Sequence, residues 1–294
     1  MKIHLLFPLI LLLACSQAKE KQRLTQLEEE IRKLMNETEG DFALAFRSVD
    51  GEESELFFNE KETFHAASTM KTPVMVALFE QEAAGKFSLQ DSILIRNSFK
   101  SILDGSTYQM DLGVDSQEAL YKRIGENATL YELMYEMIVR SSNLATNILI
   151  EKVGAKNVTQ LMRELGAEDI QVLRGVEDLK AYEAGLSNTT TALDMMLIME
   201  AIAKHKVAGS QKMIDILSDQ HFNDLIPKYL PKEVKIAHKT GAITGVQHDA
   251  AIVELPDGNR YVLVILSKNL TDEKAGKECI AKISQMIYNN IENL

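Results

Sequence analysis

Three short groups of polar residues carry side chains that can do chemistry, and they follow one another along the chain. Ser68 has a lysine, Lys71, three residues on; Ser141 is followed two residues later by Asn143; and Lys239 opens a Lys-Thr-Gly sequence. A Ser-x-x-Lys sequence alone should occur roughly once by chance in a chain of this length, so the prediction depends on the order and settings of all three groups. Together they predict a hydrolase with a serine nucleophile, because a serine hydroxyl attacks only when a nearby base takes its proton.

The first group lies where a helix is expected to begin. Ser68 precedes an apolar-periodic stretch, Met70–Phe79, and Pro73 is tolerated in a first helical turn because the amides there are unpaired. On such a helix Lys71 shares a face with Ser68, so the amine is expected beside the hydroxyl. Lys71 can accept a proton only if it is neutral or part of a relay. Burial, the helix N-terminus and a second lysine such as Lys239 would all lower its pKa.

The other two groups are placed by their surroundings. Ser141 follows a predicted helix, Leu130–Arg140, a junction where serine is also common for structural reasons alone. Lys239 and Thr240 belong to a late strand pattern. A lysine and a hydroxyl on a strand edge suit a ligand that carries a carboxylate, and Gly241 lets ligand backbone approach closely.

In order and spacing the three groups resemble the motifs of class A β-lactamases and penicillin-binding proteins. The resemblance extends from about Asp41 to the end of the chain, and it implies the fold of the serine penicillin-recognising enzymes with Ser68 as nucleophile and Lys71 as base. Ser142 departs from the pattern, because the family has an aspartate there. That aspartate is mainly a local organiser, so the departure bears on rigidity more than on chemistry.

The resemblance also implies roles for the remaining site residues. Ser141 would pass a proton to the leaving group, and Asn143 would hold the lysine base and a substrate amide. The backbone N–H groups of Ser68 and Ala242 would form the oxyanion hole.

The three groups leave open how an acyl-enzyme is released. Class A enzymes use a glutamate on an Ω-shaped loop to activate water, with an asparagine four residues later. Counting without gaps from the second group puts Glu177 at the place of that base and Ala181 at the place of the asparagine. Asn188 resembles the aspartate that closes the family's loop and pairs with its arginine, here Arg174. If Arg174 is aligned instead, the base falls on Val176, and Glu177 is a solvated carboxylate or the partner of Arg174.

Three hypotheses follow. The preferred one is a class A-like β-lactamase that hydrolyses the lactam amide through a Ser68 acyl-enzyme, with Glu177 activating water. The second is a penicillin-binding D,D-carboxypeptidase acting on peptidoglycan stem peptides, and the third is a sensor lipoprotein that β-lactams acylate without turnover. No late arginine matches the family's extra carboxylate binder. His248 is a candidate, although a structural role paired with Asp249 is favoured.

The elements that must position these residues read as strands, then helices, then strands again. Two strand patterns lie around the hairpin signal Asp50-Gly51, and three lie at the far end; they are Asp41–Val49, Glu55–Asn59, Val234–His238, Ala250–Leu255 and Tyr261–Leu266. Helical patterns dominate between them and a helix follows from about Asp272, while Thr129 with Glu132 is a capping box. We therefore expect an α+β, two-lobed fold: one five-stranded antiparallel sheet flanked by helices, a helical lobe, and a cleft between them.

The N-terminal pattern predicts a targeting signal followed by a helix. Residues 1–14 have the form of a secretory signal peptide, and Cys15 ends a lipobox-like sequence, so we expect a lipid-anchored protein facing the periplasm or the cell exterior. Within residues 15–40, Lys19–Asn36 carries a narrow apolar stripe, which we expect to pack on the protein's own domain rather than in a coiled coil. Residues 41–294 would form the catalytic domain.

Composition limits the partners. The chain has 294 residues, 46% of them hydrophobic, and its 32 basic against 43 acidic side chains give a net charge of −11, which argues against nucleic acid. With Cys15 lipidated, Cys279 is left alone as a buried hydrophobe, so no internal disulfide is expected. The scattered histidines predict no metal site. We expect a monomer that needs no cofactor and takes a small β-lactam or a D-Ala-D-Ala peptide as substrate.

Overall fold

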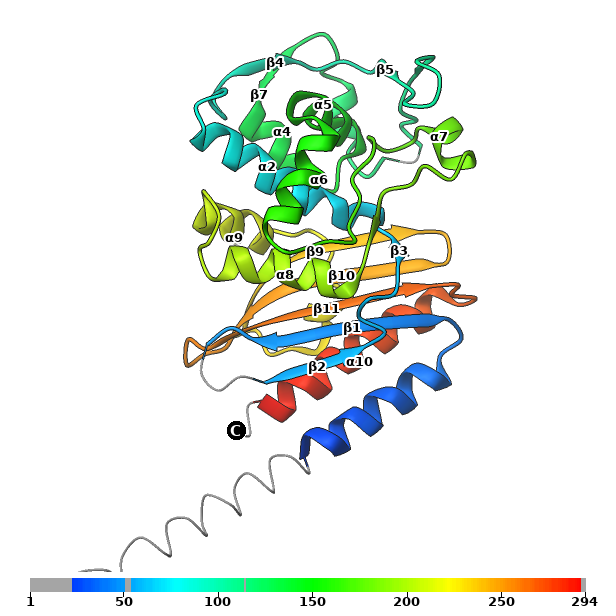
Figure 1. Cartoon of the computed structure of the whole chain (residues 1–294), viewed down its shortest axis with the longest axis vertical. Coiled ribbons are helices and arrows are strands. Elements are labelled where there is room, and N and C mark those ends of the chain that lie inside the picture. The colour runs from blue at the N-terminus through cyan, green and yellow to red at the C-terminus, as the bar shows by residue number, and fades with distance from the viewer. Residues whose placement is uncertain (1–22, 51–53, 114, 292–294) are drawn as a thin grey trace, which may run out of the picture.

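Five strands pair into one antiparallel sheet in the order β2-β1-β11-β10-β9 (Figure 1). The computed structural model describes residues 23–50, 54–113 and 115–291. The strands of the sheet are β1 (Asp41–Ser48), β2 (Glu55–Phe58), β9 (Lys235–Ile243), β10 (Val246–Glu254) and β11 (Arg260–Lys268). The predicted pairing of early with late strands is therefore confirmed. Gly51, in the predicted hairpin turn, lies outside the described residues.

Both faces of the sheet are buried, because alternate residues of its central strands enter different cores. On β1, Ala43 and Ala45 pack toward the helical lobe, whereas Phe42, Leu44 and Phe46 pack on the opposite side. Strand β11 divides in the same way. Since neighbouring side chains of a strand point to opposite faces, a strand buried on both faces is apolar throughout, as these strands are.

Helices cover the two faces. Their bounds are η1 (Ala67–Met70), α2 (Lys71–Ala83), α3 (Glu118–Tyr121), α4 (Leu130–Val139), α5 (Asn143–Val153), α6 (Ala155–Glu164), α7 (Leu179–Glu183), α8 (Ala192–Ala203), α9 (Ser210–Ser218), η2 (Ile226–Tyr229) and α10 (Glu273–Ile291). Helix α8 packs on β1, β10 and β11 from the side of the helical lobe, and α10 lies on the other face (Figure 1). Thr129 and Thr191 cap α4 and α8 as N-cap residues.

The helical lobe is built around α2, whose residues from Lys71 to Phe79 are all buried. A helix that is apolar on every side belongs in a core, and α4, α5 and α6 pack around it. Short strand pairs link the lobe's loops; they are β3 (Phe64–His65) with β8 (Thr189–Thr190), β4 (Ser92–Leu94) with β7 (Asn127–Thr129), and β5 (Phe99–Lys100) with β6 (Thr107–Tyr108). The predicted helical lobe is confirmed.

An N-terminal helix, residues 23–37, lies on the same side of the sheet as α10 (Figure 1). Leu27, Ile31 and Met35 are buried in the cluster that contains the inner residues of α10, so the predicted packing on the chain's own domain is confirmed. Cys279 is buried in that cluster, and burial raises the pKa of its thiol to about 11.

The predicted signal peptide and Cys15 lie outside the described residues. Among helices of the described chain, none combines the length and apolar character needed to cross a membrane.

Candidate active site

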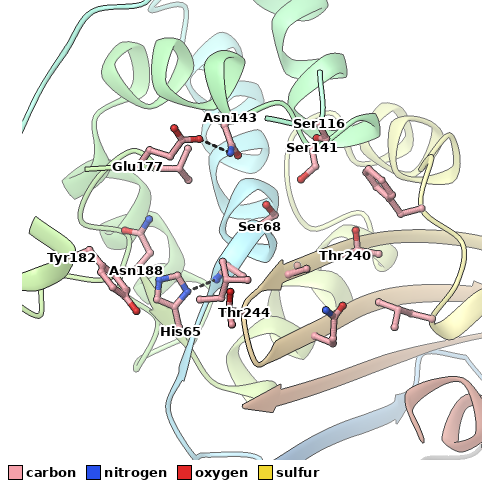
Figure 2. A pocket seen from close by; sticks show the side chains of 18 of the residues that line it. His65, Ser68, Ser116, Ser141, Asn143, Glu177, Tyr182, Asn188, Thr240 and Thr244 are labelled. Carbon is pink, nitrogen blue, oxygen red and sulfur yellow. Dashed lines mark hydrogen bonds between the residues drawn. The ribbon is translucent and has the colours of Figure 1, made fainter. Parts of the chain in front are cut away.

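A cleft of about 490 Å³ lies where strand β9 meets the helical lobe. Its lining includes most of the predicted site residues: Ser68, Ser141, Asn143, Glu177, Thr240, Gly241 and Ala242. Figure 2 shows Ser68 between Glu177 on one side and Thr240 on the other. Lys71 and Lys239 are fully buried and reach Ser141 at the edge of this cleft. The structure thus brings all three polar groups together, although Lys239 lies 171 positions after Ser68 in the sequence.

Ser68 lies in the short helix η1, directly before α2, as predicted for a helix start. Ala67 adopts a left-handed backbone conformation, with φ at 44°. A non-glycine residue in this region is strained and is held there only by its surroundings. Gly241 provides part of them: a Cβ at that position would lie 3.2 Å from the amide nitrogen of Ser68. The glycine therefore permits β9 to approach the Ser68 amide.

Lys71 holds the second polar group in place. Its Nζ donates to the backbone oxygen of Ser141 at 2.6 Å, to Ser141 Oγ at 3.2 Å and to Asn143 Oδ1 at 2.9 Å. Burial lowers the pKa of Lys71 to about 7, although the carboxylates of Asp115 and Glu177 oppose the shift. No hydrogen bond joins Lys71 Nζ to Ser68 Oγ among the described residues. Near neutral pH this amine can accept a proton.

Lys239 approaches Ser141 from the sheet. Its Nζ donates to Ser141 Oγ at 3.1 Å and to the backbone oxygen of Thr240 at 2.9 Å. Burial, and then the positive charge of Lys71, holds the pKa of Lys239 well below its usual value. Ser141 itself has φ at 58°, so the junction between α4 and α5 is strained where the two lysines meet. The Ser141 hydroxyl accepts from both amines, which leaves its own proton free to be donated.

Ser142 caps the helix that carries Asn143. It is the N-cap of α5, fully buried, and its Oγ accepts from the amide nitrogen of Ala145 at 3.2 Å. Serine is a strong N-cap residue. The helix start is therefore capped at this position although the resemblance implies an aspartate there, and Asn143 extends from the first position of the helix.

Glu177 joins the site through Asn143. Its Oε1 accepts from Asn143 Nδ2 at 2.9 Å, the contact dashed in Figure 2, and its Oε2 accepts from the amide nitrogen of Asp111 at 3.0 Å. Burial raises the pKa of the Glu177 carboxyl, while these two hydrogen bonds lower it. The residue has φ at 60°, a strained backbone that turns the side chain toward the cleft. Among the described residues Glu177 forms no ion pair with Arg174.

The neighbouring positions do not supply a second base. Val176 is held through its backbone, since its N–H donates to Asn147 Oδ1 at 2.7 Å and its carbonyl accepts from Asn147 Nδ2 at 3.0 Å. Ala181 is buried in α7 and offers no side-chain amide. Of these three positions, only Glu177 places a carboxylate in the lining of the cleft.

Asn188, a neutral residue, joins the two ends of the loop that carries Glu177. Its Oδ1 accepts from the amides of Leu173 and Arg174, and its Nδ2 donates to the Arg174 carbonyl. The Arg174 guanidinium donates to the backbone oxygens of Leu186 and Gly175. Backbone hydrogen bonds thus do here what an aspartate–arginine pair is implied to do in the family.

The suggested role of His248 as a carboxylate binder is wrong, and so is its pairing with Asp249. His248 is fully buried, with Nε2 at 2.8 Å from the backbone oxygen of His65. Asp249 pairs with His238 instead, Oδ1 to Nδ1 at 2.9 Å. On strand β10 the side chains of consecutive residues point to opposite faces of the sheet, so His248 and Asp249 cannot contact each other. The expected structural role of His248 is confirmed.

Several residues that line the cleft carry no sequence signal: His65, Ser116, Tyr182, Asp224 and Lys277. They come from separate elements and form no motif, so spacing could not find them. Among the described residues no cluster of His, Cys, Asp and Glu side chains could hold a metal ion.

Comparisons with known proteins agree with this geometry. A family model described as "Beta-lactamase enzyme family" matches residues 26–291. The chain is 26% identical to a β-lactamase of Bacillus licheniformis, covering 96% of this chain and 92% of that protein, and 24% identical to a β-lactamase of Bacteroides uniformis, covering 98% and 99%.

Solved structures show the same fold. A β-lactamase from Sphaerobacter thermophilus DSM 20745 superposes with a TM-score of 0.77 at 26% identity, covering 90% of this chain and 97% of that one. PBP-A superposes with a TM-score of 0.78 at 29% identity, covering 92% and 97%. The family match spans nearly the whole chain and includes every residue of the cleft described above. The chain therefore belongs to the beta-lactamase enzyme family.

Proposed function

We propose that the protein is a class A-like serine β-lactamase that opens the lactam amide through an acyl-enzyme on Ser68. The observation that carries this proposal is a continuous hydrogen-bonded path in the cleft wall, from Lys239 through Ser141, Lys71 and Asn143 to Glu177. The side chains that would accept or donate a proton during acylation and hydrolysis, namely Lys71, Ser141 and Glu177, all belong to this path.

In acylation, Ser68 Oγ attacks the lactam carbonyl and its proton passes to a neutral amine. Lys71 is suited to accept it, because its pKa of about 7 leaves much of it neutral at physiological pH. The proton then has to reach the lactam nitrogen as the C–N bond breaks. Ser141 can deliver its own proton there and be reprotonated by Lys71 or Lys239, both of which contact its oxygen.

Substrate binding would use the strand edge. Thr240 and the buried ammonium of Lys239 suit the carboxylate of a β-lactam, and the amides of Ser68 and Ala242 suit the carbonyl oxygen that becomes negative in the transition state. The close approach of Gly241 to the Ser68 amide supports this arrangement.

In deacylation, Glu177 would take a proton from the attacking water. Its carboxylate lines the cleft and is linked to Lys71 through Asn143. A carboxyl with a raised pKa is a stronger base than an exposed one, which suits this role. The Ser68 oxygen would then leave with the proton that Glu177 took from the water, so that Glu177 and Lys71 both end the cycle in their starting protonation states.

A second candidate is a penicillin-binding D,D-carboxypeptidase acting on peptidoglycan stem peptides. Two observations favour it: the similarity to PBP-A, including an acyl-enzyme complex of a PBP-A mutant with penicillin G, and the absence of an amide side chain at Ala181. A sensor that is acylated without turnover is the third candidate.

Turnover of a chromogenic cephalosporin by three proteins would decide among them: wild type, Ser68→Ala and Glu177→Gln. A β-lactamase hydrolyses many equivalents as wild type and none as Ser68→Ala, and Glu177→Gln accumulates a Ser68 adduct visible by mass spectrometry. Glu183→Gln, an exposed carboxylate of the same loop, is the matched control and should retain turnover.

Other outcomes assign the other functions. A stable wild-type adduct with cleavage of a D-Ala-D-Ala peptide indicates the carboxypeptidase, and a stable adduct without peptide cleavage indicates the sensor. If no adduct forms with any β-lactam or peptide mimic, the assignment of Ser68 as nucleophile fails.

We also propose that the protein is exported and held on a bacterial membrane by lipid on Cys15. The apolar run that ends at this cysteine supports the proposal.

A further inference from the structure

Asp115 and Ser116, in a short segment of the helical lobe, both form hydrogen bonds to the junction between α4 and α5. Asp115 Oδ2 accepts from the amide nitrogen of Leu144 at 2.9 Å. Ser116 Oγ donates to the backbone oxygen of Arg140. These two contacts lie on either side of Ser141 and Asn143, the residues that bind Lys71.

The Asp115 carboxylate is itself held firmly. Its Oδ2 also accepts from the Tyr121 hydroxyl at 3.0 Å, and its Oδ1 accepts from the amide nitrogen of Gln117 at 3.1 Å. A carboxylate is an acceptor only, and each of these contacts comes from a donor. Asp115 therefore has a fixed position from which to act on α5.

Helix α5 needs this acceptor. The first amides of a helix have no partner within it. Ser142 Oγ satisfies Ala145, the third residue of α5, but its short side chain leaves Leu144, the second, to another group. Asp115 supplies that group and adds a negative charge, which is favourable at a helix N-terminus.

We propose that Asp115 is a positioning residue of the candidate active site: by accepting the Leu144 amide it fixes the start of α5, and with it Ser141 and Asn143 against Lys71. It is not a catalytic residue, because it acts through α5 and does not line the cleft. Only the kinetic prediction of this inference rests on the proposed function, because the effect of Asp115 on Lys71 can be measured without substrate.

Asp115 also influences the charges of the site. The groups facing Lys71 are Asp115, Glu177 and Lys239, and the Asp115 carboxylate raises the pKa of Lys71 against the dominant effect of burial. The groups facing Glu177 are Asp115 and Asp111, and both raise the pKa of the Glu177 carboxyl, here in the same direction as burial. Removing the Asp115 charge should therefore lower both pKa values, a result that a purely mechanical support would not produce.

The direct test is a pH titration of the Lys71 ε-carbon by NMR of protein labelled with ¹³C-lysine. In the wild type this signal, identified by its loss in Lys71→Arg, should titrate near pH 7. In Asp115→Asn, which keeps an acceptor for Leu144 but no charge, the midpoint should fall by about half a pH unit. Asp115→Ser is a second charge-free variant that keeps a short acceptor, so the test does not depend on one variant folding.

The matched control is Glu118→Gln, which removes the same charge from an exposed side chain three residues on. In this variant the titration midpoint of the Lys71 signal should equal that of the wild type. If the midpoint in a folded Asp115→Asn or Asp115→Ser protein also equals the wild type, the inference is overturned.

The kinetic test is kcat/KM against pH with a chromogenic cephalosporin. Asp115→Ala, which removes the acceptor of the Leu144 amide, should lose about tenfold in kcat/KM, the size expected for a weakened helix cap next to the reacting groups. Its acid limb should move to lower pH, because both bases then lose their protons at lower pH. A wild type without turnover would defeat the proposed function, while the NMR result would still decide the role of Asp115.

Discussion

At the scale of single residues, the site depends on two buried lysines that share one serine. Lys71 and Lys239 are both fully buried, and both donate to Ser141 Oγ. Burial disfavours an ammonium ion and two such ions disfavour each other, so at least one amine is readily neutral. The same arrangement that makes a base of a lysine makes the folded protein less stable than an uncharged site would.

The first prediction concerns this stability. The pKa of Lys71 is about 7 in the folded protein and 10.5 when unperturbed, so between these values the unfolded chain binds more protons and stability rises with pH. Lys71→Met removes the buried amine and should raise the Tm at pH 7 by on the order of 5 °C, with a gain that shrinks toward pH 10. Thermal unfolding from pH 6 to 10 measures it. Lys122→Met, at the exposed position directly after α3, is the control and should show no such pH dependence. A Lys71→Met gain that is constant with pH would contradict the assignment.

The site residues differ in how far the sequence could predict them. Ser68, Lys71 and Lys239 are fixed by the chemistry they perform, and their types and order predict the site. Asp115 performs no chemistry, and its contact with α5 depends on how two distant segments pack, so no local pattern reveals it. The partner of Asp249 was missed for the same reason, because it lies across the sheet rather than next along the chain.

At the scale of elements, the loop from Arg174 to Asn188 is held at several points by amide side chains. Asn188, at one end of the loop, binds Leu173 and Arg174 at the other end, and Asn147 of α5 binds both backbone groups of Val176. Gly175 is required there, because a Cβ would lie 2.3 Å from Asn147 Oδ1. The loop therefore sets the direction of the Glu177 side chain through α5, the helix that also carries Asn143.

The second prediction tests this connection. Asn147→Ala frees Val176 and should slow deacylation about tenfold, by loosening Glu177, while leaving the rate of Ser68 acylation within about twofold. Stopped-flow kinetics with a chromogenic cephalosporin separates the two steps. Asn157→Ala removes a comparable amide that binds Val153 at the far end of α5, and it should change neither step. Equal losses in acylation and deacylation would show that Asn147 acts on the whole site instead.

At the scale of the whole molecule, the sequence predicts the sheet and the two-lobed plan, because strand runs and turn signals report burial directly. Its apolar runs, Val234–His238 and Ala250–Leu255, are shorter than the observed β9 and β10, Lys235–Ile243 and Val246–Glu254, although Lys239 and Thr240 are also predicted to belong to a strand pattern. The residues beyond these apolar runs include five polar ones, Lys239, Thr240, Gln247, His248 and Asp249, which pair in the sheet while they line or underlie the cleft. The rule that strands are apolar thus fails at the site itself, where function requires buried polar groups.

The third prediction concerns the N-terminal helix. Ile31 is fully buried in the core that contains the inner residues of α10. Ile31→Ala should lower the free energy of unfolding by about 3 kcal/mol and leave cephalosporin turnover at 25 °C unchanged. Glu29→Ala, on the exposed side of the helix, should alter neither quantity. A change of molar mass in light scattering on Ile31→Ala, without loss of stability, would indicate that the helix pairs between molecules.

The fourth prediction concerns where the molecule resides. A lipoprotein signal transfers the chain to the membrane only through its cysteine, and several acyl chains hold it there stably where one would not. Expressed in bacteria with labelled palmitate, the wild type should carry label and fractionate with membranes, whereas Cys15→Ser should carry none and be recovered in the soluble fraction. Cys279→Ser is the matched control, because that thiol is buried on the inner side of α10 and should not affect labelling. A wild type that is unlabelled and soluble would show that the apolar run at the N-terminus belongs to a plain secretory signal, and label that persists in Cys15→Ser would show that the lipid is attached to another residue.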